Sequence, residues 1–195
     1  GFIMFLELLN ASESICVMEA SGPYYLKLAT FLSASGIDVC VINPLIIRRF
    51  SQMRMSRAKT DKKDAMLIAE YGKTETPSLW QPEENYVLEL KQMQAYLDQL
   101  NKNRTGFIVQ KEAFSQNPVK SETLEKSINS VLEIIEQEIK QIEKTMELII
   151  KTHYLEMFNQ LKSIPGMGTK TSLFLIVISG GFSKFNNSKQ LASYV

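Results

Sequence analysis

Apolar and polar positions follow two different patterns along this chain. Residues 14–19 and 37–42 are short, nearly continuous apolar runs rich in Val and Ile, which is typical of parallel strands buried on both faces. Between them, apolar side chains recur at helical spacing after Gly22 and Pro23, and Gly36 supplies a helix stop. A strand, helix, strand unit of this kind predicts an α/β domain.

Residues 45–82 contain a basic segment, a helix and a proline-containing segment in that order. Residues 45–60 form a basic connector, and the next helix is expected to begin after its cap at Thr60 and to stop at Gly72. Residues 76–82 contain two prolines and the only Trp, so they are interpreted as a linker. The α/β domain is therefore expected to occupy residues 1–82.

Two long helices are predicted for residues 83–152. Apolar side chains recur at spacings of three, four and seven in residues 83–114 and again in residues 121–152, with the turn SQNPVK between them. Two helices of roughly 30 residues, each about 45 Å long, with a short connector predict an antiparallel helical hairpin. The apolar stripe is narrow, which favours an oligomeric coiled coil.

Composition narrows the class only slightly. The chain has 195 residues, of which 45% are apolar and 22% charged, as is ordinary for a soluble globular protein. Its net charge of +1 does not indicate a nucleic-acid partner, so only local clustering of charge can do so. Cys16 and Cys40 lie in apolar runs, which suits buried free thiols in a reducing cytosol. No apolar stretch reaches the roughly 18–20 residues that span a bilayer, so we expect a soluble protein without a membrane partner.

Three carboxylates are candidates for chemistry. Glu19 ends a buried strand, at the position where open α/β sheets carry functional groups. Asp61 and Asp64 are spaced i, i+3 on the next helix, and that stripe continues through Ala65 and Ile68 toward the expected core. Clustered carboxylates repel one another unless a cation neutralises them, and oxygen ligands favour Mg²⁺, so a two-metal phosphodiester site is one interpretation. The other is that the aspartates complement the helix dipole and Glu19 caps the following turn.

A basic run borders these acids. Residues 48–63 carry seven basic side chains against a single Asp, a local surplus of six positive charges. Such a run is often only a solvated face, but next to possible metal ligands it favours contact with a phosphate backbone. The basic residues are Arg48, Arg49, Arg54, Arg57, Lys59, Lys62 and Lys63.

A second nucleic-acid signal is the sequence LKSIPGMGTKT at residues 161–171. Gly166 and Gly168 allow backbone N–H groups at a helix N-terminus to approach a phosphate, with Lys170 beside them. The segment resembles a helix-hairpin-helix element, and the alternative is a plain connector between helices. Residues 173–178 are expected in the core. His153, the only histidine, lacks cysteines at zinc spacing and is expected to be a surface or packing residue.

Taken together, these blocks resemble a known family. The sequences MEASGPYYLKLATFL, VCVINP and KTDKKDA, at residues 18–32, 39–44 and 59–65, are similar to the Glu and Asp-x-x-Asp blocks of the DEDD transposases of the insertion-sequence-110 family. IPGMGTKT and the later FSKFNNSKQLASYV resemble the start of that family's second conserved domain. The resemblance covers nearly the whole chain in the family's order.

The resemblance implies an incomplete RNase H-like (RuvC-like) domain, the hairpin, and a helix-hairpin-helix-like segment at residues 153–195. It matches Glu19, Asp61 and Asp64 to the second, third and fourth acids of a Mg²⁺ site. It also implies cleavage and rejoining of DNA strands, guided by a structured RNA, in the bacterial cytoplasm. The family's first Asp and its serine nucleophile have no counterpart here. We therefore expect a transposase fragment, cut at both ends and inactive by itself.

Two other functions stay open. A non-catalytic nucleic-acid-binding or assembly module would use the hairpin and the basic run, with the acids as relics. A junction resolvase of the RuvC type would use the acids but leave the IPGMG sequence unexplained. An Asp encoded upstream and a Ser encoded downstream would favour the transposase. The expected partners are DNA, a structured guide RNA and further copies of the chain, associated through the hairpin.

Overall fold

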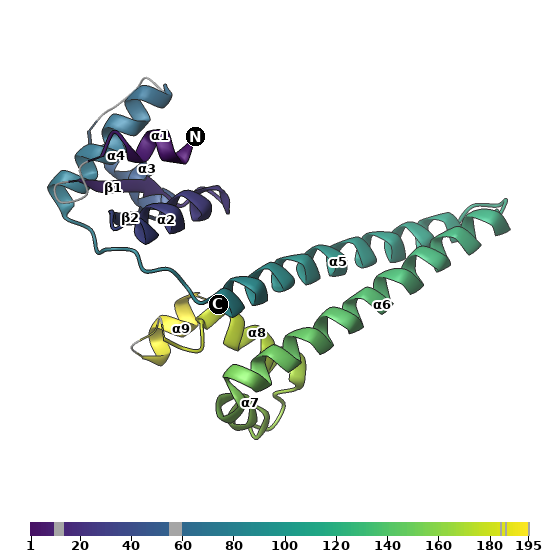
Figure 1. The fold of residues 1–195 in the computed structure, drawn as a ribbon. Coiled ribbons are helices and arrows are strands. Elements are labelled where there is room, and N and C mark those ends of the chain that lie inside the picture. The colour runs from purple at the N-terminus through teal and green to yellow at the C-terminus, as the bar shows by residue number, and fades with distance from the viewer. Residues whose placement is uncertain (10–13, 55–59, 184, 186, 195) are drawn as a thin grey trace. The chain divides into compact units, whose positions relative to one another are not determined.

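The computed structural model describes residues 1–9, 14–54, 60–183, 185 and 187–194 (Figure 1). The chain divides into two compact units, Gly1–Pro82 and Glu83–Val195. The first unit combines helices with a small sheet, and the second contains only helices among the residues that are described. None of the helices in these ranges is both long enough and apolar enough to cross a membrane.

The sheet of the first unit has two parallel strands, β1 (Ile15–Glu19) and β2 (Asp38–Ile42). Their register pairs the first residue of each strand, and Glu19 lies beside Ile42 at the other end. Helix α2 (Tyr24–Ala34) connects the strands and buries Ala29 and Leu32 completely against β2. The structure thus confirms the predicted strand, helix, strand unit. The prediction was possible because the apolar runs and the glycine stop are local signals in the sequence.

The linker at residues 76–82 belongs to the first unit and contacts β2. The Trp80 backbone N–H donates to the Val39 carbonyl oxygen at 2.7 Å, and the Trp80 side chain packs on the core around Leu32. The Cys40 thiol donates to the Pro77 carbonyl oxygen at 3.4 Å. Both cysteines are free, and burial raises the pKa of the Cys16 and Cys40 thiols. Both are free thiols, as the sequence predicts, but only Cys40 is buried, since Cys16 is half-buried.

Half of the predicted basic connector is a helix, α3 (Pro44–Met53). The Asn43 side chain accepts a hydrogen bond from the Leu45 N–H at 2.8 Å, and Pro44 stands at the first helical position, where its missing N–H costs nothing. Ile47 and Phe50 are buried. The expectation of a connector was wrong here, because Asn43 and Pro44 start a helix whose apolar face is buried. Helix α1 (Phe2–Leu6) packs on α2.

The second unit is built on the hairpin of α5 (Asn85–Ser115) and α6 (Glu122–His153) (Figure 1). Arg104 pairs with Glu136 at 3.2 Å, and nearer the connector Lys111 donates to Asn129 at 2.7 Å. Since the partner's number falls as the first number rises, the helices are antiparallel, which confirms the predicted hairpin. The buried residues between them are Leu90, Leu97, Leu100, Ile135, Ile139, Met146 and Ile150.

Three shorter helices complete the second unit: α7 (Leu155–Lys162), α8 (Thr169–Ser179) and α9 (Ser188–Tyr194). Phe158 of α7 and Leu173, Ile176 and Val177 of α8 join the hairpin core. The predicted core segment at residues 173–178 is thus largely confirmed, although Phe174 is 37% exposed. The hairpin, α7 and α8 therefore share one core.

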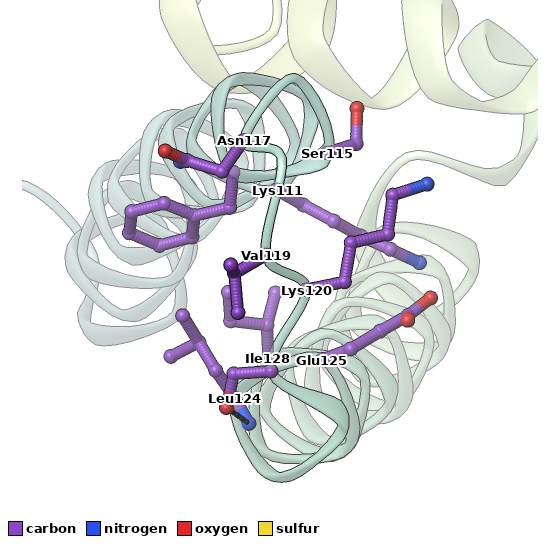
Figure 2. A pocket seen from close by; sticks show the side chains of 10 residues that line it. Lys111, Ser115, Asn117, Val119, Lys120, Leu124, Glu125 and Ile128 are labelled. Carbon is purple, nitrogen blue, oxygen red and sulfur yellow. Dashed lines mark hydrogen bonds between the residues drawn. The ribbon is translucent and has the colours of Figure 1, made fainter.

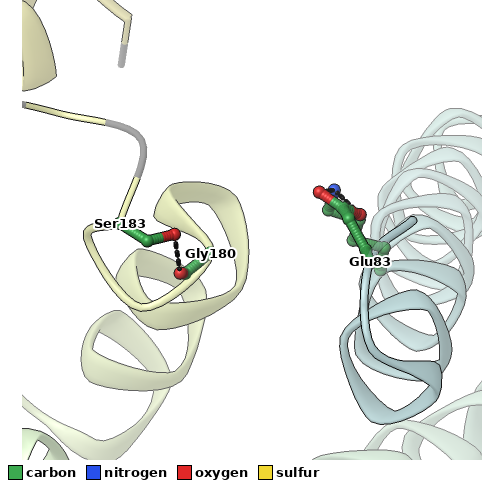
Figure 3. A network of polar contacts seen from close by, with 4 residues as sticks. Glu83, Gly180 and Ser183 are labelled. Atoms are coloured by element: carbon green, nitrogen blue, oxygen red, sulfur yellow. Dashed lines mark hydrogen bonds and ion pairs between the residues drawn. The ribbon is translucent and has the colours of Figure 1, made fainter. Parts of the chain in front are cut away.

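Aromatic side chains join the hairpin to its C-terminal helices. His153 is exposed and stacks on Tyr86 with ring centroids 3.7 Å apart, so the expectation of a surface or packing residue is confirmed. Burial, a hydrogen bond with Tyr86 and the charge of Glu83 raise the pKa of Tyr154 to about 12, which keeps it neutral. Figure 3 shows Glu83, which pairs with Lys91, and the Ser183 hydroxyl, which donates to the Gly180 carbonyl oxygen at 2.7 Å.

Candidate functional site

Glu19 is the last residue of β1, and its side chain is half-buried. The chain turns immediately after it: the Ala20 N–H donates to the Ile42 carbonyl oxygen and the Ser21 N–H to the Glu19 carbonyl oxygen, both at 2.9 Å. The strand end therefore fixes the backbone of Glu19 while its carboxylate stays partly in contact with solvent.

Asp61 and Asp64 lie in the first turn of α4 (Asp61–Glu75), and both are exposed. The Thr60 hydroxyl oxygen accepts the Lys63 N–H at 3.3 Å, which confirms the predicted cap. The prediction that Ala65 faces the core was wrong, because Ala65 is exposed. The half-buried side of α4 begins at Leu67 and includes Ile68 and Tyr71, which pack on the cluster of Cys40, Ile42 and Ile47.

Helix α4 packs against β1 through Gly72. A Cβ atom at Gly72 would overlap the Val17 side chain, whose own Cβ would be 3.3 Å away. Gly72 was expected to end the helix, but α4 continues to Glu75. The sequence could not separate these two uses of glycine, since a close helix–strand contact and a helix stop both favour the smallest residue.

Helix α4 also contributes to the core beside the sheet. Ile15, at the start of β1, lines a shallow hollow with Gly72 and Lys73. Leu67 and Ile68, earlier on α4, pack on the cluster of Cys40, Ile42 and Ile47. The first turn of α4, with the two aspartates, therefore precedes the part of the helix that packs on the sheet.

The three acids do not form a preassembled metal centre. Among the residues that the structure describes, no group of three or more His, Cys, Asp or Glu side chains is close enough to hold a metal ion. The predicted convergence of Glu19, Asp61 and Asp64 is therefore not seen in this structure, and their role as metal ligands stays a prediction. Carboxylates that lack a neutralising cation repel one another, and residues 55–59, which lead into the first turn of α4, lie outside the described ranges.

Gly72→Ala is expected to destabilise the protein by about 1–3 kcal/mol, because the added methyl group must displace the stiff Val17 side chain. Chemical denaturation followed by circular dichroism measures this. Gly106 on α5 is a matched control: it too is helical, and an added Cβ would meet no atom within 4 Å. Gly106→Ala should stabilise by roughly 0.5–1 kcal/mol. Equal effects of the two substitutions would contradict the close α4–β1 contact.

The basic run is only partly available to a ligand. Arg48 and Arg49 are exposed on α3, whereas Arg54 pairs with Glu70 of α4 at 2.9 Å and lies 5.2 Å from the centre of the Phe50 ring. Arg54 therefore helps to hold α3 against α4. The pairing of Arg54 with Glu70 could not be predicted from the sequence, because no local pattern connects the two residues.

The other predicted basic residues are distributed around the start of α4. Lys62 and Lys63 are exposed in its first turn. The predicted contacts at Arg57 and Lys59 fall outside the residues that the structure describes. The described cations next to the aspartates are thus Lys62 and Lys63, which lie on the same helical turn as Asp61 and Asp64.

The glycine turn connects α7 and α8. Gly166 has φ +85°, which favours glycine, whereas Gly168 caps α8 with an ordinary φ of −83°. The Met167 N–H donates to the Ile164 carbonyl oxygen at 3.0 Å. Lys170 pairs with Glu143 of α6 at 2.6 Å, although its side chain is 75% exposed. The lysine therefore has a structural partner that its sequence neighbourhood could not reveal.

Comparison with known proteins identifies the class of this chain as a transposase. Residues 3–114 match the DEDD group described as "Transposase", and residues 159–195 match the group described as "Transposase IS116/IS110/IS902 family". The chain belongs to the IS110 family of transposases, and the resemblance seen in the sequence is confirmed.

Two relatives carry the same printed name. The chain is 36% identical over 189 residues to the "Pilin gene-inverting protein" of Moraxella lacunata and 36% identical over 192 residues to that of Moraxella bovis. Each alignment covers 95% of this chain and 56% of the relative. The chain thus spans little more than half the length of the curated relatives that it matches.

Proposed function

We propose that this chain is part of a recombinase that cleaves and rejoins DNA strands at a metal site formed by Glu19, Asp61 and Asp64. The observation that supports this most directly is the packing of α4 on β1 at Gly72. This packing brings the helix that carries Asp61 and Asp64 against the strand that ends at Glu19. Binding of a divalent cation would require the three carboxylates to move together.

The donor set suits Mg²⁺. All three side chains offer carboxylate oxygens, which are the ligands that hard divalent cations prefer, and both aspartates are exposed, which leaves room for water and phosphate. Bound there, the cation would stabilise the negative charge that develops on a phosphodiester during cleavage. The protein's part is to hold the carboxylates in position and to place the cations of α3 and α4 near the DNA backbone.

Nucleic-acid contact is assigned to the basic run and the glycine turn. Arg48, Arg49, Lys62 and Lys63 are exposed and can pair with phosphates without losing an internal partner. Arg57 and Lys59, which lie outside the described residues, remain candidates from the sequence alone. Gly166, Gly168 and the exposed amine of Lys170 would form a second contact, in the manner of a helix-hairpin-helix element. A structured guide RNA and the DNA are the proposed ligands.

Replacing Arg48 and Arg49 together with Gln is expected to weaken DNA binding similarly for all sequences. The slope of log K against log salt should also flatten by roughly two units, since each lost phosphate contact removes about one. Titrations of a labelled duplex at several salt concentrations measure both effects. The control replaces Lys126 and Lys151 with Gln. Both lysines pair with glutamates along α6, and the double substitution removes the same charge as the arginine variant. Equal slopes in both variants would mean that Arg48 and Arg49 do not contact phosphates and form only a solvated face.

We also propose that copies of the chain associate through the hairpin as a coiled coil. Ile134 and Leu148 are 60% and 59% exposed on α6 although the hairpin core is complete without them. Burying such residues against a second copy is favourable. The proposed contact surface is therefore the exposed side of α6 with Ile134 and Leu148. The apolar stripe expected from the sequence cannot serve, because Ile135 of that stripe lies buried inside the hairpin.

The particular reaction proposed is inversion or transposition of a DNA segment. Its support is the 36% identity to two proteins named for inverting a pilin gene. Incubating a full-length protein with Mg²⁺, a candidate RNA and two labelled duplexes tests it, since joined products of mixed label demonstrate strand exchange. Binding of the duplexes without any joined product would instead support the non-catalytic assembly module.

A further inference from the structure

The outer end of the hairpin contains a cavity of about 160 Å³. It is lined by the last turn of α5, the connector at residues 116–121 and the first turns of α6. Figure 2 shows Val119 and Lys120 on the connector, with Leu124, Glu125 and Ile128 on α6 beside them. Since a cavity of roughly 150 Å³ can accept a benzene molecule, this one has room for an apolar side chain.

Apolar side chains surround this cavity at the surface. Val119 is 85% exposed, Leu124 40% and Phe114 36%. Connectors between helices are normally polar where they face water, and Val119 adds almost nothing to the burial of its own chain. The connector therefore carries an apolar cavity together with an apolar side chain, Val119, that no described residue buries.

The charges around the cavity are of both signs. Lys120 and Glu125 line it, and neither has an ion-pair partner within the described part of the chain. Lys111 also lines the cavity and donates to Asn129. Over residues 114–128 as a whole the charges balance, since Lys120 and Lys126 stand against Glu122 and Glu125. A surface with balanced charges around an apolar centre is typical of a protein partner, whereas a nucleic-acid partner requires a positive surplus.

We propose that the hairpin tip, residues 114–128, binds the tip of a second copy of this chain across a two-fold axis. In such an interface both copies use the same surface, so the protruding side chain of each copy meets the cavity of the other. Val119 of each copy covers the cavity of the other, and Lys120 of each copy faces Glu125 of the other. The inference rests on the proposed association of copies through the hairpin and names the surface at which their ends meet.

The contact is small. A tip of this size buries less area than the roughly 1,200–2,000 Å² of a stable interface. Tip-to-tip binding is therefore a weak contact, of micromolar order, that becomes effective when other contacts or DNA bring copies together.

Sedimentation velocity of the full chain over a range of concentrations tests the proposal. Val119→Asp should weaken self-association at least tenfold, while Leu155→Asp, a control on α7 whose native side chain is 50% exposed, should leave it unchanged. Both positions are exposed, and unchanged helicity by circular dichroism verifies folding. Unchanged association of Val119→Asp would overturn the tip contact.

Charge exchange supplies a second test that no folding defect can imitate. Lys120→Glu alone and Glu125→Lys alone should each weaken association, since every contact then joins like charges. An equimolar mixture of the two variants should recover the affinity of the original chain, because each interface then pairs opposite charges. Failure to recover on mixing would overturn the two-fold arrangement.

Substitutions on the side of the hairpin separate this proposal from the one it rests on. If Ile134→Asp and Leu148→Asp weaken association while Val119→Asp does not, the tip contact is refuted and association through the hairpin side stands. If the original chain stays monomeric at every concentration, both are refuted.

Discussion

DNA strand cleavage by the full-length protein is expected to fall at least roughly a hundredfold when Asp61 is replaced by Asn. Loss of one carboxylate ligand weakens the charge stabilisation that the cation provides, which is worth several kcal/mol in the transition state. Glu19→Gln should have an effect of similar size. Gel assays with an end-labelled duplex in Mg²⁺ measure the rate.

Asp98→Asn is the control for the loss of one negative charge. Asp98 is exposed on α5 and accepts a hydrogen bond from Gln94 at 2.9 Å, so cleavage should not change. If Asp61 only complements the dipole of α4, Asp61→Asn should leave cleavage intact and lower stability by about 0.3–1 kcal/mol. That outcome would refute the metal site and favour the non-catalytic module.

Phe158→Ala is expected to destabilise the second unit by about 3–5 kcal/mol, because the substitution leaves a cavity where α7 meets α6 and α8. The Phe158 side chain is 1% exposed and packs with Met146 and Ile150. Urea denaturation followed by circular dichroism measures the change. Leu155→Ala on the same helix is the control, since Leu155 is 50% exposed and its truncation should cost less than roughly 1 kcal/mol. Similar losses from both would mean that α7 does not share the hairpin core.

The parts of the fold that the sequence predicted well are those with local signals. The hairpin was predicted at residues 83–114 and 121–152, and the helices run from Asn85 to Ser115 and from Glu122 to His153. Long helices repeat one periodic pattern many times, so chance departures matter little. The two strands were found for a related reason, since each is an apolar run bounded by turn residues.

The parts that were missed depend on contacts between distant residues. Gly72 has the same local signature as a helix stop, and only the neighbouring Val17 shows why a glycine is needed there. The ion pairs of Arg54 with Glu70 and of Lys170 with Glu143 connect residues with no periodic relation. For the candidate site, the motifs name Glu19, Asp61 and Asp64 as candidates, but the spacing between Glu19 and the aspartates depends on packing between distant segments.

The stacking of His153 on Tyr86 means that the hairpin begins and ends at nearly the same point in space. An insertion whose two ends meet can change in length without disturbing what it is attached to. Adding the same number of turns to α5 and α6 would carry the tip outward by about 1.5 Å per residue in each helix and leave Tyr154 and α7 where they are. The length of the hairpin therefore determines how far the hairpin tip, residues 114–128, lies from the rest of the second unit.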